Sequence, residues 1–246
     1  MGYYNSSTYH LGKRFAINGK YTGNFNNLTM KYTQSEIVNF MLEHNYSDEN
    51  FAIMAGDEDY LRRTNPGLFK DTWFRNSLKD SRTHLQYCQD LVSDWIYEDK
   101  VVATIEKQNP KLKVELNGGD KERCILGHKI TNNPDFKIFY KQKYLLVEMA
   151  MSHGGYCYNQ EEINFRNNKR LHLVEQNSWF LQVDFSMSST IYALLKTTDL
   201  EEYTESTAWG KKTDCVAVPK NKYQPISNLG QMLEYYIRIY GHIEED

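Results

Sequence analysis

Two apolar segments separated by a short polar connection constrain the fold of this chain more than any other feature. The first spans residues 136–140 and the second spans residues 144–150, with Lys-Gln-Lys between them. Short segments rich in aromatic and branched apolar side chains are typical of β-strands, and so short a connection joins antiparallel neighbours. We therefore expect a β-hairpin at the centre of a sheet.

The rest of the chain alternates between helix and strand patterns. Helices are expected from about 34 and over 70–108, 160–176 and 228–240, and strands at 113–116, 124–126, 179–185 and 191–195. The sequence Asn-Pro-Gly at 65–67 predicts a loop that separates a small N-terminal region, 1–70, from a core, 71–246. The order of elements indicates an α/β (α+β) fold, in which a central mixed β-sheet is flanked by helices.

Composition supports a globular protein. The 246 residues include 29 Lys and Arg against 32 Asp and Glu, and 40% are hydrophobic. The aromatic content, 14%, argues against a disordered chain, and the near-neutral charge excludes a uniformly basic nucleic-acid coat protein. The four cysteines form no CxxC pair, and no window approaches the roughly 18 apolar residues of a membrane span. We expect a cytoplasmic protein with no membrane contact.

Two carboxylates occupy positions where strands rarely carry charge. Asp135 follows Pro134 at the start of the first hairpin strand, and Glu148 interrupts the apolar run of the second. If the hairpin pairs as expected, both lie near the same end of the sheet. Adjacent carboxylates repel each other, and a divalent cation between them removes that cost. Oxygen ligands select Mg²⁺ or Mn²⁺, which can generate hydroxide and polarise a phosphodiester.

A third carboxylate, Glu98, lies inside the apolar stripe of the helix expected over 70–108. At about 100° per residue, Glu98 falls on the same face as Trp95 and Val102. A buried charge needs a metal, a cation or a water-filled cleft as its partner, unless Glu98 lies at the rim and reaches solvent.

The sequence Pro134-Asp135, followed by Glu148-Met149-Ala150, resembles the PD-(D/E)xK nuclease family, whose motif is Pro-Asp, a variable gap and Asp/Glu-x-Lys. The resemblance covers about residues 90–195. It implies a restriction-endonuclease-like core in which Asp135 and Glu148 hold Mg²⁺ or Mn²⁺, and Glu98 is the acidic residue that many members place beside the metal.

Ala150 departs from this motif, because the family has a lysine that orients the attacking water at that position. Three explanations remain open. Another cation reaches the site, with Lys137, Lys143 and Lys169 as candidates; the chain is naturally inactive; or the lysine was deliberately changed to alanine. A different reading takes Asp120 as the first acid and residues 135–137 as Asp-x-Lys, but residues 144–147 look more like the buried strand that the motif requires.

Charge is unevenly distributed along the sequence. Residues 100–170 carry 13 Lys and Arg against 8 Asp and Glu, a local charge of +5 that leaves −8 for the remainder. A polyanionic substrate fits this segment. The candidates for phosphate contacts are Lys137, Lys141, Lys143, Arg166, Lys169 and Arg170, each of which also fits an ordinary solvated surface.

The sequence therefore predicts a metal-dependent endonuclease acting on double-stranded DNA, of type II restriction-enzyme class, in which residues 1–70 contribute to DNA recognition. Cutting both strands requires two active sites, so a homodimer is expected. A phage or repair nuclease with structure specificity is an alternative, as are a non-catalytic DNA-binding protein on a nuclease-like fold and a tyrosine-rich protein-interaction module. A structural alternative to the metal site is that Asp135 faces solvent after the proline turn and Glu148 pairs with a lysine.

Overall fold

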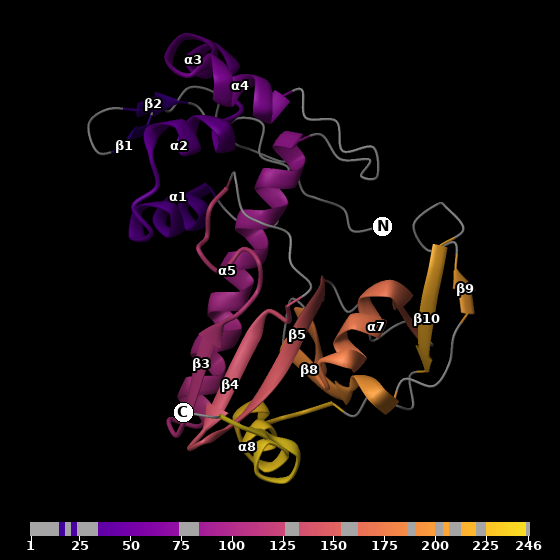
Figure 1. The fold of residues 1–246 in the computed structure, drawn as a ribbon. Coiled ribbons are helices and arrows are strands. Elements are labelled where there is room, and N and C mark those ends of the chain that lie inside the picture. Colours follow the sequence, from indigo (N-terminus) through magenta and orange to yellow (C-terminus); the bar gives the residue numbers. More distant parts are fainter. Residues whose placement is uncertain are drawn as a thin grey trace. The chain divides into compact units, whose positions relative to one another are not determined.

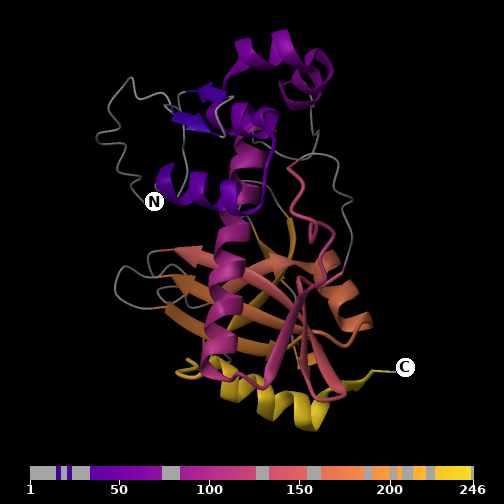
Figure 2. The same cartoon turned by 90° about the vertical axis from the view of Figure 1, so that its left-hand side faces the viewer.

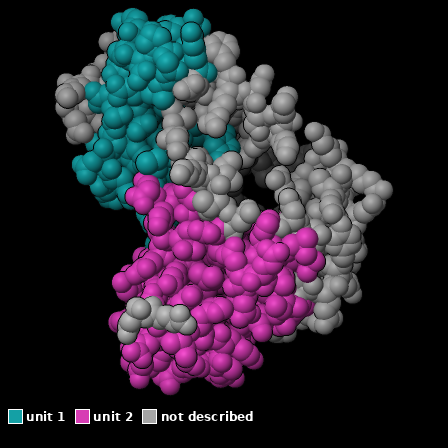
Figure 3. Space-filling model, viewed as in Figure 1, with its two compact units in different colours: residues 1, 3–99, 123–127 teal, residues 2, 100–122, 128–246 magenta. Residues whose placement is uncertain are grey.

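The computed structural model describes residues 15–17, 21–23, 34–73, 84–125, 133–153, 162–185, 190–199, 204–206, 213–219 and 225–244 (Figure 1). The chain divides into two compact units (Figure 3). One comprises residues 1, 3–99 and 123–127, and the other comprises residues 2, 100–122 and 128–246. None of the helices in the described ranges is long and apolar enough to cross a membrane.

The first unit holds a small hairpin and a set of helices. Its elements are β1 (Phe15–Ile17), β2 (Tyr21–Gly23), α1 (Gln34–Glu43), α2 (Asp48–Ala55), α3 (Glu58–Thr64), α4 (Pro66–Trp73) and the first part of α5 (His84–Gln108). The helix predicted from about residue 34 is confirmed as α1, and the side chains expected on its apolar face, Ile37, Phe40 and Met41, are buried.

The loop predicted at Asn65-Pro66-Gly67 is wrong, because Pro66 begins α4. Proline has no backbone N–H to satisfy and its fixed φ suits the first helical position. The Asn65 side chain accepts a hydrogen bond from the Leu68 N–H at 3.1 Å, as an N-terminal capping residue does. A single residue thus separates α3 from α4.

The second unit is built on a mixed sheet with the strand order β3-β4-β5-β7-β8, and β11 pairs with one end of β5. These strands are β3 (Leu112–Leu116), β4 (Phe136–Tyr140), β5 (Lys143–His153), β7 (Trp179–Phe185), β8 (Thr190–Lys196) and β11 (His242–Ile243). Only β5 and β7 pair in parallel. The expected mixed sheet flanked by helices is confirmed, with the β4–β5 hairpin inside it.

The sheet has one apolar face and one face that carries polar groups. Alternate residues of the strands, including Phe136, Val147 and Leu181, pack with Val101 of α5 and Leu233 of α8 (Leu229–Tyr240) into the main core. Figure 2 shows α8 beside the strands of this sheet. The residues between them, including Glu148, project to the opposite face. The next helix after β5 among the described residues, α7 (Asn167–Glu175), contributes Lys169 to that face.

Two parts of the second unit differ from the sequence predictions. Cys124 and Ile125 are not in a strand, and the helix expected from residue 160 begins only at Asn167. The preceding residues form β6 (Glu162–Arg166), which pairs with β10 (Thr213–Pro219) in a second sheet completed by β9 (Thr204–Ser206). The sequence Ile-Asn-Phe in β6 alternates with a period of two, and pairing with a distant strand outweighed local helix propensity.

Candidate active site

The hairpin brings Asp135 and Glu148 together. In the β4–β5 ladder Phe136 is opposite Val147, so the residue before β4 is opposite Glu148. The two carboxyl groups share a hydrogen bond, and the Met149 N–H donates to Asp135 Oδ2 at 2.8 Å. The side chain of Glu148 is only 4% exposed. The structure therefore places an acid pair at the end of the hairpin where the sequence predicts it.

A turn after β3 holds Asp135 in place. The Asn117 N–H donates to the Asp135 carbonyl at 2.7 Å, and its side-chain amide donates to the Pro134 carbonyl at 2.9 Å. Gly118 leaves room for the acids, because a Cβ atom there would lie 2.9 Å from Asp120 Oδ1 and 3.5 Å from Asp135 Oδ1. The turn that begins with Asn117 and Gly118 therefore holds the end of β3 close to the two carboxylates.

Burial and mutual repulsion make this acid pair retain a proton. Burial and the charge of Asp135 together raise the pKa of Glu148 to about 8, against the opposing effect of Lys169. Burial also raises the pKa of Asp135, against the effects of Lys169 and the Met149 N–H, while Asp120 adds to the rise. In the metal-free protein the pair therefore shares a proton near neutral pH.

Of the three lysines named as candidate cations, Lys169 is the one that contacts the acid pair in the described residues. Its ammonium group forms an ion pair with Glu148 Oε1, although it comes from α7 rather than from β5. Its side chain is 56% exposed, so a solvent-accessible lysine reaches a buried carboxylate. Ala150, at the motif position, lies two residues beyond Glu148 on the same face of β5.

The other lysines offered as substitutes have different partners. Lys137 pairs with Glu244 at 2.7 Å and lies over the rings of Phe139 and Tyr144. Lys143 donates to the carbonyl of Arg238 at 3.0 Å. Both contacts connect the β4–β5 hairpin to the C-terminal segment, residues 238–244. Among the predicted phosphate contacts, Lys141 is exposed and Arg170 is half-buried, whereas the side chain of Arg166 is outside the described residues.

Glu98 is buried, and its partner is a cation in the first unit. Arg123 Nη1 donates to Glu98 Oε2 at 2.5 Å, and Nη2 donates to Asp99 Oδ1 at 2.9 Å. The Tyr46 hydroxyl donates to the carbonyl of Arg123, and the guanidinium lies 5.6 Å from the Trp95 ring centre. The expectation that Glu98 needs a partner is confirmed. Its role beside a metal stays a prediction, and this ion pair gives it a structural role.

Replacing Arg123 with Met is expected to destabilise the first unit by about 3–5 kcal/mol, because Glu98 would remain buried without its cation. The double variant Glu98→Leu/Arg123→Met should lose less stability, since no unpaired charge remains. Urea unfolding followed by tryptophan fluorescence measures both effects. A matched control is Arg62→Met, which removes the exposed pair with Glu58 and should cost about 0–1 kcal/mol. Equal losses for Arg123→Met and Arg62→Met would contradict the buried-pair account.

The acid pair is suited to a divalent cation. Within the described residues no group of three or more His, Cys, Asp or Glu side chains is placed to hold a metal, so two carboxylates are the available ligands. Mg²⁺ is commonly bound by one or two carboxylates, with water and substrate phosphate oxygens completing its shell. A buried pair that must otherwise retain a proton fits such an ion, because the ion replaces the proton.

The pKa of Glu148 predicts how stability depends on pH. Its folded-state value, about 8, is above the ordinary 4.5, so its contribution to stability is fully present below pH 4.5 and is lost as pH rises through 8. Mg²⁺ binds the deprotonated pair, so the Mg²⁺-induced rise in melting temperature should grow over the same interval. Thermal unfolding at several pH values, with and without Mg²⁺, measures this. A Mg²⁺ effect independent of pH would contradict the prediction.

Sequence reasoning missed two further polar residues on this face. Gln182 and Asp184 of β7 are buried, and they pair with Ala150 and Ser152 of β5. The signal was present, because both interrupt an apolar strand in the way that Glu148 does. The face that carries the acid pair therefore continues as a polar row across the parallel strands.

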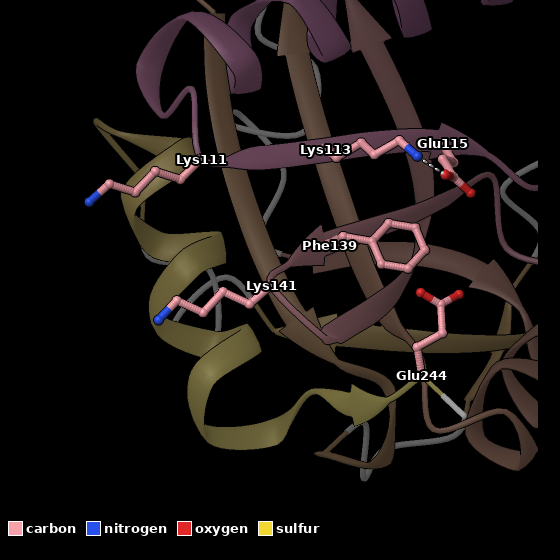
Figure 4. Close-up of a pocket in the computed structure, with 6 residues that line it drawn as sticks. All are labelled: Lys111, Lys113, Glu115, Phe139, Lys141 and Glu244. Carbon is pink, nitrogen blue, oxygen red and sulfur yellow. Dashed lines mark hydrogen bonds and ion pairs between the residues drawn. The ribbon is translucent and has the colours of Figure 1, made fainter. Parts of the chain in front are cut away.

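A surface pocket lies on the same face of the sheet, toward the other end of the hairpin. It has a volume of about 240 Å³ and is lined by Lys111, Lys113, Glu115, Phe139, Lys141 and Glu244 (Figure 4). Lys113 turns to Glu115, while Lys111 and Lys141 extend away from the Phe139 ring. These two exposed lysines place positive charge along the strands that lead to Asp135.

No protein-family model matches the sequence, and no curated protein is significantly similar to it. A solved structure that resembles the chain is that of Hjc, a Holliday junction resolvase from the archaeal hyperthermophile Archaeoglobus fulgidus. The two chains share 11% identity with a TM-score of 0.35, and the alignment covers 56% of this chain and 97% of the resolvase. At this level of similarity we base the function on the geometry of the site alone.

Proposed function

We propose that the chain is a metal-dependent endonuclease that hydrolyses phosphodiester bonds in double-stranded DNA. One observation carries the proposal: Asp135 and Glu148, both with raised pKa values, form an acid pair that Lys169 contacts from a separate helix. An acid pair with one nearby cation is the donor set that the PD-(D/E)xK motif supplies. Here the cation comes from α7, and this accounts for Ala150 at the motif position.

Each residue has a distinct part in this proposal. Asp135 and Glu148 would hold Mg²⁺, with Mn²⁺ as a substitute, and the ion supplies polarisation of the phosphate and a lowered pKa for water. Lys169 stabilises negative charge that develops on the phosphate in the transition state. The 56% exposure of its side chain leaves it accessible to DNA while it contacts Glu148. The Met149 N–H keeps Asp135 oriented.

Exposed lysines would hold the DNA backbone beside the site. Lys111 and Lys141 line the pocket on the same sheet face, and contacts of this kind add affinity without reading sequence. Lys137, Lys143, Arg166 and Arg170 remain proposed contacts, although Lys137 and Lys143 also fasten the C-terminal segment.

The double variant Lys111→Ala/Lys141→Ala is expected to weaken DNA binding equally for all sequences. Each lost phosphate contact reduces the slope of log K against log[salt] by about 0.9, so the slope should fall by about 2. Fluorescence anisotropy in EDTA, at several salt concentrations, measures it. Lys107→Ala, an exposed lysine of α5, is the control and should leave the slope unchanged. An unaltered slope in the double variant would remove these lysines from the interface.

The finer assignment is a type II restriction enzyme that acts as a homodimer in the cytoplasm, because cutting both strands requires two active sites. A phage or repair nuclease with structure specificity uses the same site chemistry. Supercoiled plasmid, linear duplex and a four-way junction, each incubated with Mg²⁺ or Mn²⁺, distinguish the two. Defined fragments from plasmid indicate a restriction enzyme, and cleavage confined to the junction indicates a structure-specific nuclease.

The same experiment tests the nuclease proposal itself. Cleavage of any of these substrates that requires the divalent ion and disappears in Asp135→Asn is the expected result. Salt-sensitive DNA binding without cleavage, by both the natural chain and an Ala150→Lys variant, would indicate a non-catalytic DNA-binding protein. Absence of DNA binding at low salt would contradict both functions.

A further inference from the structure

Gln182 lies beside the motif position on the neighbouring strand. In the parallel β5–β7 ladder it pairs with Ala150, and in the antiparallel β7–β8 ladder it pairs with Ala193. Residues paired in this way project to the same side of a sheet, which here is the side of Glu148. The amide therefore stands between two methyl side chains, next to the acid pair.

The distances along the sheet bring Gln182 within reach of the site. Residues two apart on a strand are separated by about 7 Å, and neighbouring strands by about 5 Å. The Cα atoms of Glu148 and Gln182 are therefore separated by one step along β5 and one step across to β7. A water molecule or a phosphate oxygen near the acid pair falls within the length of a glutamine side chain.

Within the described part of the chain, Gln182 uses only part of its hydrogen-bonding capacity. Gln182 is 4% exposed and Glu148 is 3% exposed, so the two residues are equally buried. A side-chain amide offers two N–H donors and one acceptor oxygen. Within the described residues it makes one side-chain hydrogen bond, from Nε2 to the Val183 carbonyl at 3.3 Å. The second N–H and Oε1 have no partner in that part of the chain. Among the described residues, Arg123 Nε is the only buried side-chain atom that lacks a hydrogen-bond partner, so the amide of Gln182 is not sealed from water. A water molecule or a substrate oxygen on this face of the sheet can therefore bond to it.

We infer that Gln182 is a catalytic residue of the proposed nuclease, so the inference depends on that function. Oε1 accepts a hydrogen bond from the attacking water, and the free N–H donates to a non-bridging oxygen of the scissile phosphate. The two tasks of the missing motif lysine are thus divided. Lys169 provides the charge from α7, and Gln182 orients the water from β7.

The amide takes no proton in this reaction. The water oxygen forms the new bond to phosphorus and its proton passes to solvent. The opposite P–O bond breaks, and the leaving oxygen keeps the electron pair and is protonated by solvent. Gln182 fixes the direction of attack, and orientation of this kind contributes to the rate without changing the affinity for DNA.

Gln182→Met tests the inference, because Met preserves the volume and removes both polar groups. The single-turnover cleavage rate should fall by about 10- to 100-fold. DNA affinity in EDTA and the Mg²⁺-induced shift in melting temperature should stay unchanged. Gln231→Met, on the exposed side of α8, is the control for the substitution and should cleave normally.

Gln182→Glu gives a second measurement that does not require cleavage. The introduced carboxyl would lie near Asp135 and Glu148, so the melting temperature of the metal-free variant should fall more steeply with pH than that of the natural protein. Its pH–rate profile should also gain an ionisation. The melting temperature checks that position 182 lies beside the acid pair, and the pH–rate profile is the catalytic readout, because a purely structural role for Gln182 predicts no added ionisation in it.

The outcomes separate this inference from the proposed function. If the natural chain cleaves DNA and Gln182→Met cleaves at the same rate, the inference is wrong and the nuclease stands. A metal-free Gln182→Glu profile that coincides with that of the natural protein also overturns it, even if Gln182→Met fails to fold. If the natural chain cleaves no DNA substrate, both proposals fail.

Discussion

Replacing Asp135 with Asn is expected to abolish DNA cleavage and, at pH 8, to raise the melting temperature of the metal-free protein. Cleavage should fall about 10³-fold or more, because one of two Mg²⁺ ligands is lost. Stability should rise because burial and the charge of Asp135 together raise the pKa of Glu148 to about 8. A neutral amide removes that repulsion, while its oxygen can still accept from the Met149 N–H. A stabilising change that destroys activity is characteristic of a functional site.

Plasmid cleavage rates and metal-free thermal unfolding at pH 6 and pH 8 measure these two effects. The gain in melting temperature should be smaller at pH 6, where the proton shared by the pair already reduces repulsion. Glu106→Gln, an exposed carboxylate on α5, is the matched control and should change neither quantity. If Asp135→Asn cleaves DNA as well as Glu106→Gln does, Asp135 is not a metal ligand.

Lys169→Ala is expected to lower the cleavage rate about 10²- to 10³-fold, the effect of removing one group that stabilises transition-state charge. Adding Ala150→Lys to this variant should raise its cleavage rate by at least about tenfold, because a lysine on β5 then projects to the same face as Glu148. The rescue is specific: it tests whether the positions on α7 and β5 serve the same site.

Lys107→Ala controls for the loss of one exposed lysine and should cleave at the natural rate. The measurement is the single-turnover rate at saturating protein, so that DNA affinity does not enter. Lys169→Ala with full activity would show that its ion pair with Glu148 is structural. Loss of activity without rescue by Ala150→Lys would show that a lysine on β5 cannot replace the one on α7.

The sequence predicted the hairpin and its acids because both depend on local pattern. A period of two fixes which residues of β5 share a face, and Glu148 is conspicuous in an apolar strand. The mixed sheet followed from the order of such segments. The same rule applied to β7 would have identified Gln182, which was overlooked because an uncharged amide is less conspicuous than a carboxylate.

The sequence could not select Lys169 among three lysines, because that choice depends on where α7 packs. Nothing local distinguishes Lys169 from Lys137 or Lys143, and only the folded chain pairs it with Glu148. Arg123 was unforeseeable as the partner of Glu98 for the same reason, since 24 residues separate them in the sequence. Residues that form an ion pair across a long stretch of sequence leave no periodic pattern from which the pairing could be predicted.

The most direct test of the account is a crystal structure of the natural protein grown with Mn²⁺, with anomalous scattering used to locate the ion. We predict a manganese peak bound by the carboxylates of Asp135 and Glu148. Mn²⁺ bound only elsewhere, with Glu148 still paired to Lys169 and sharing a proton with Asp135, would contradict the proposed metal site.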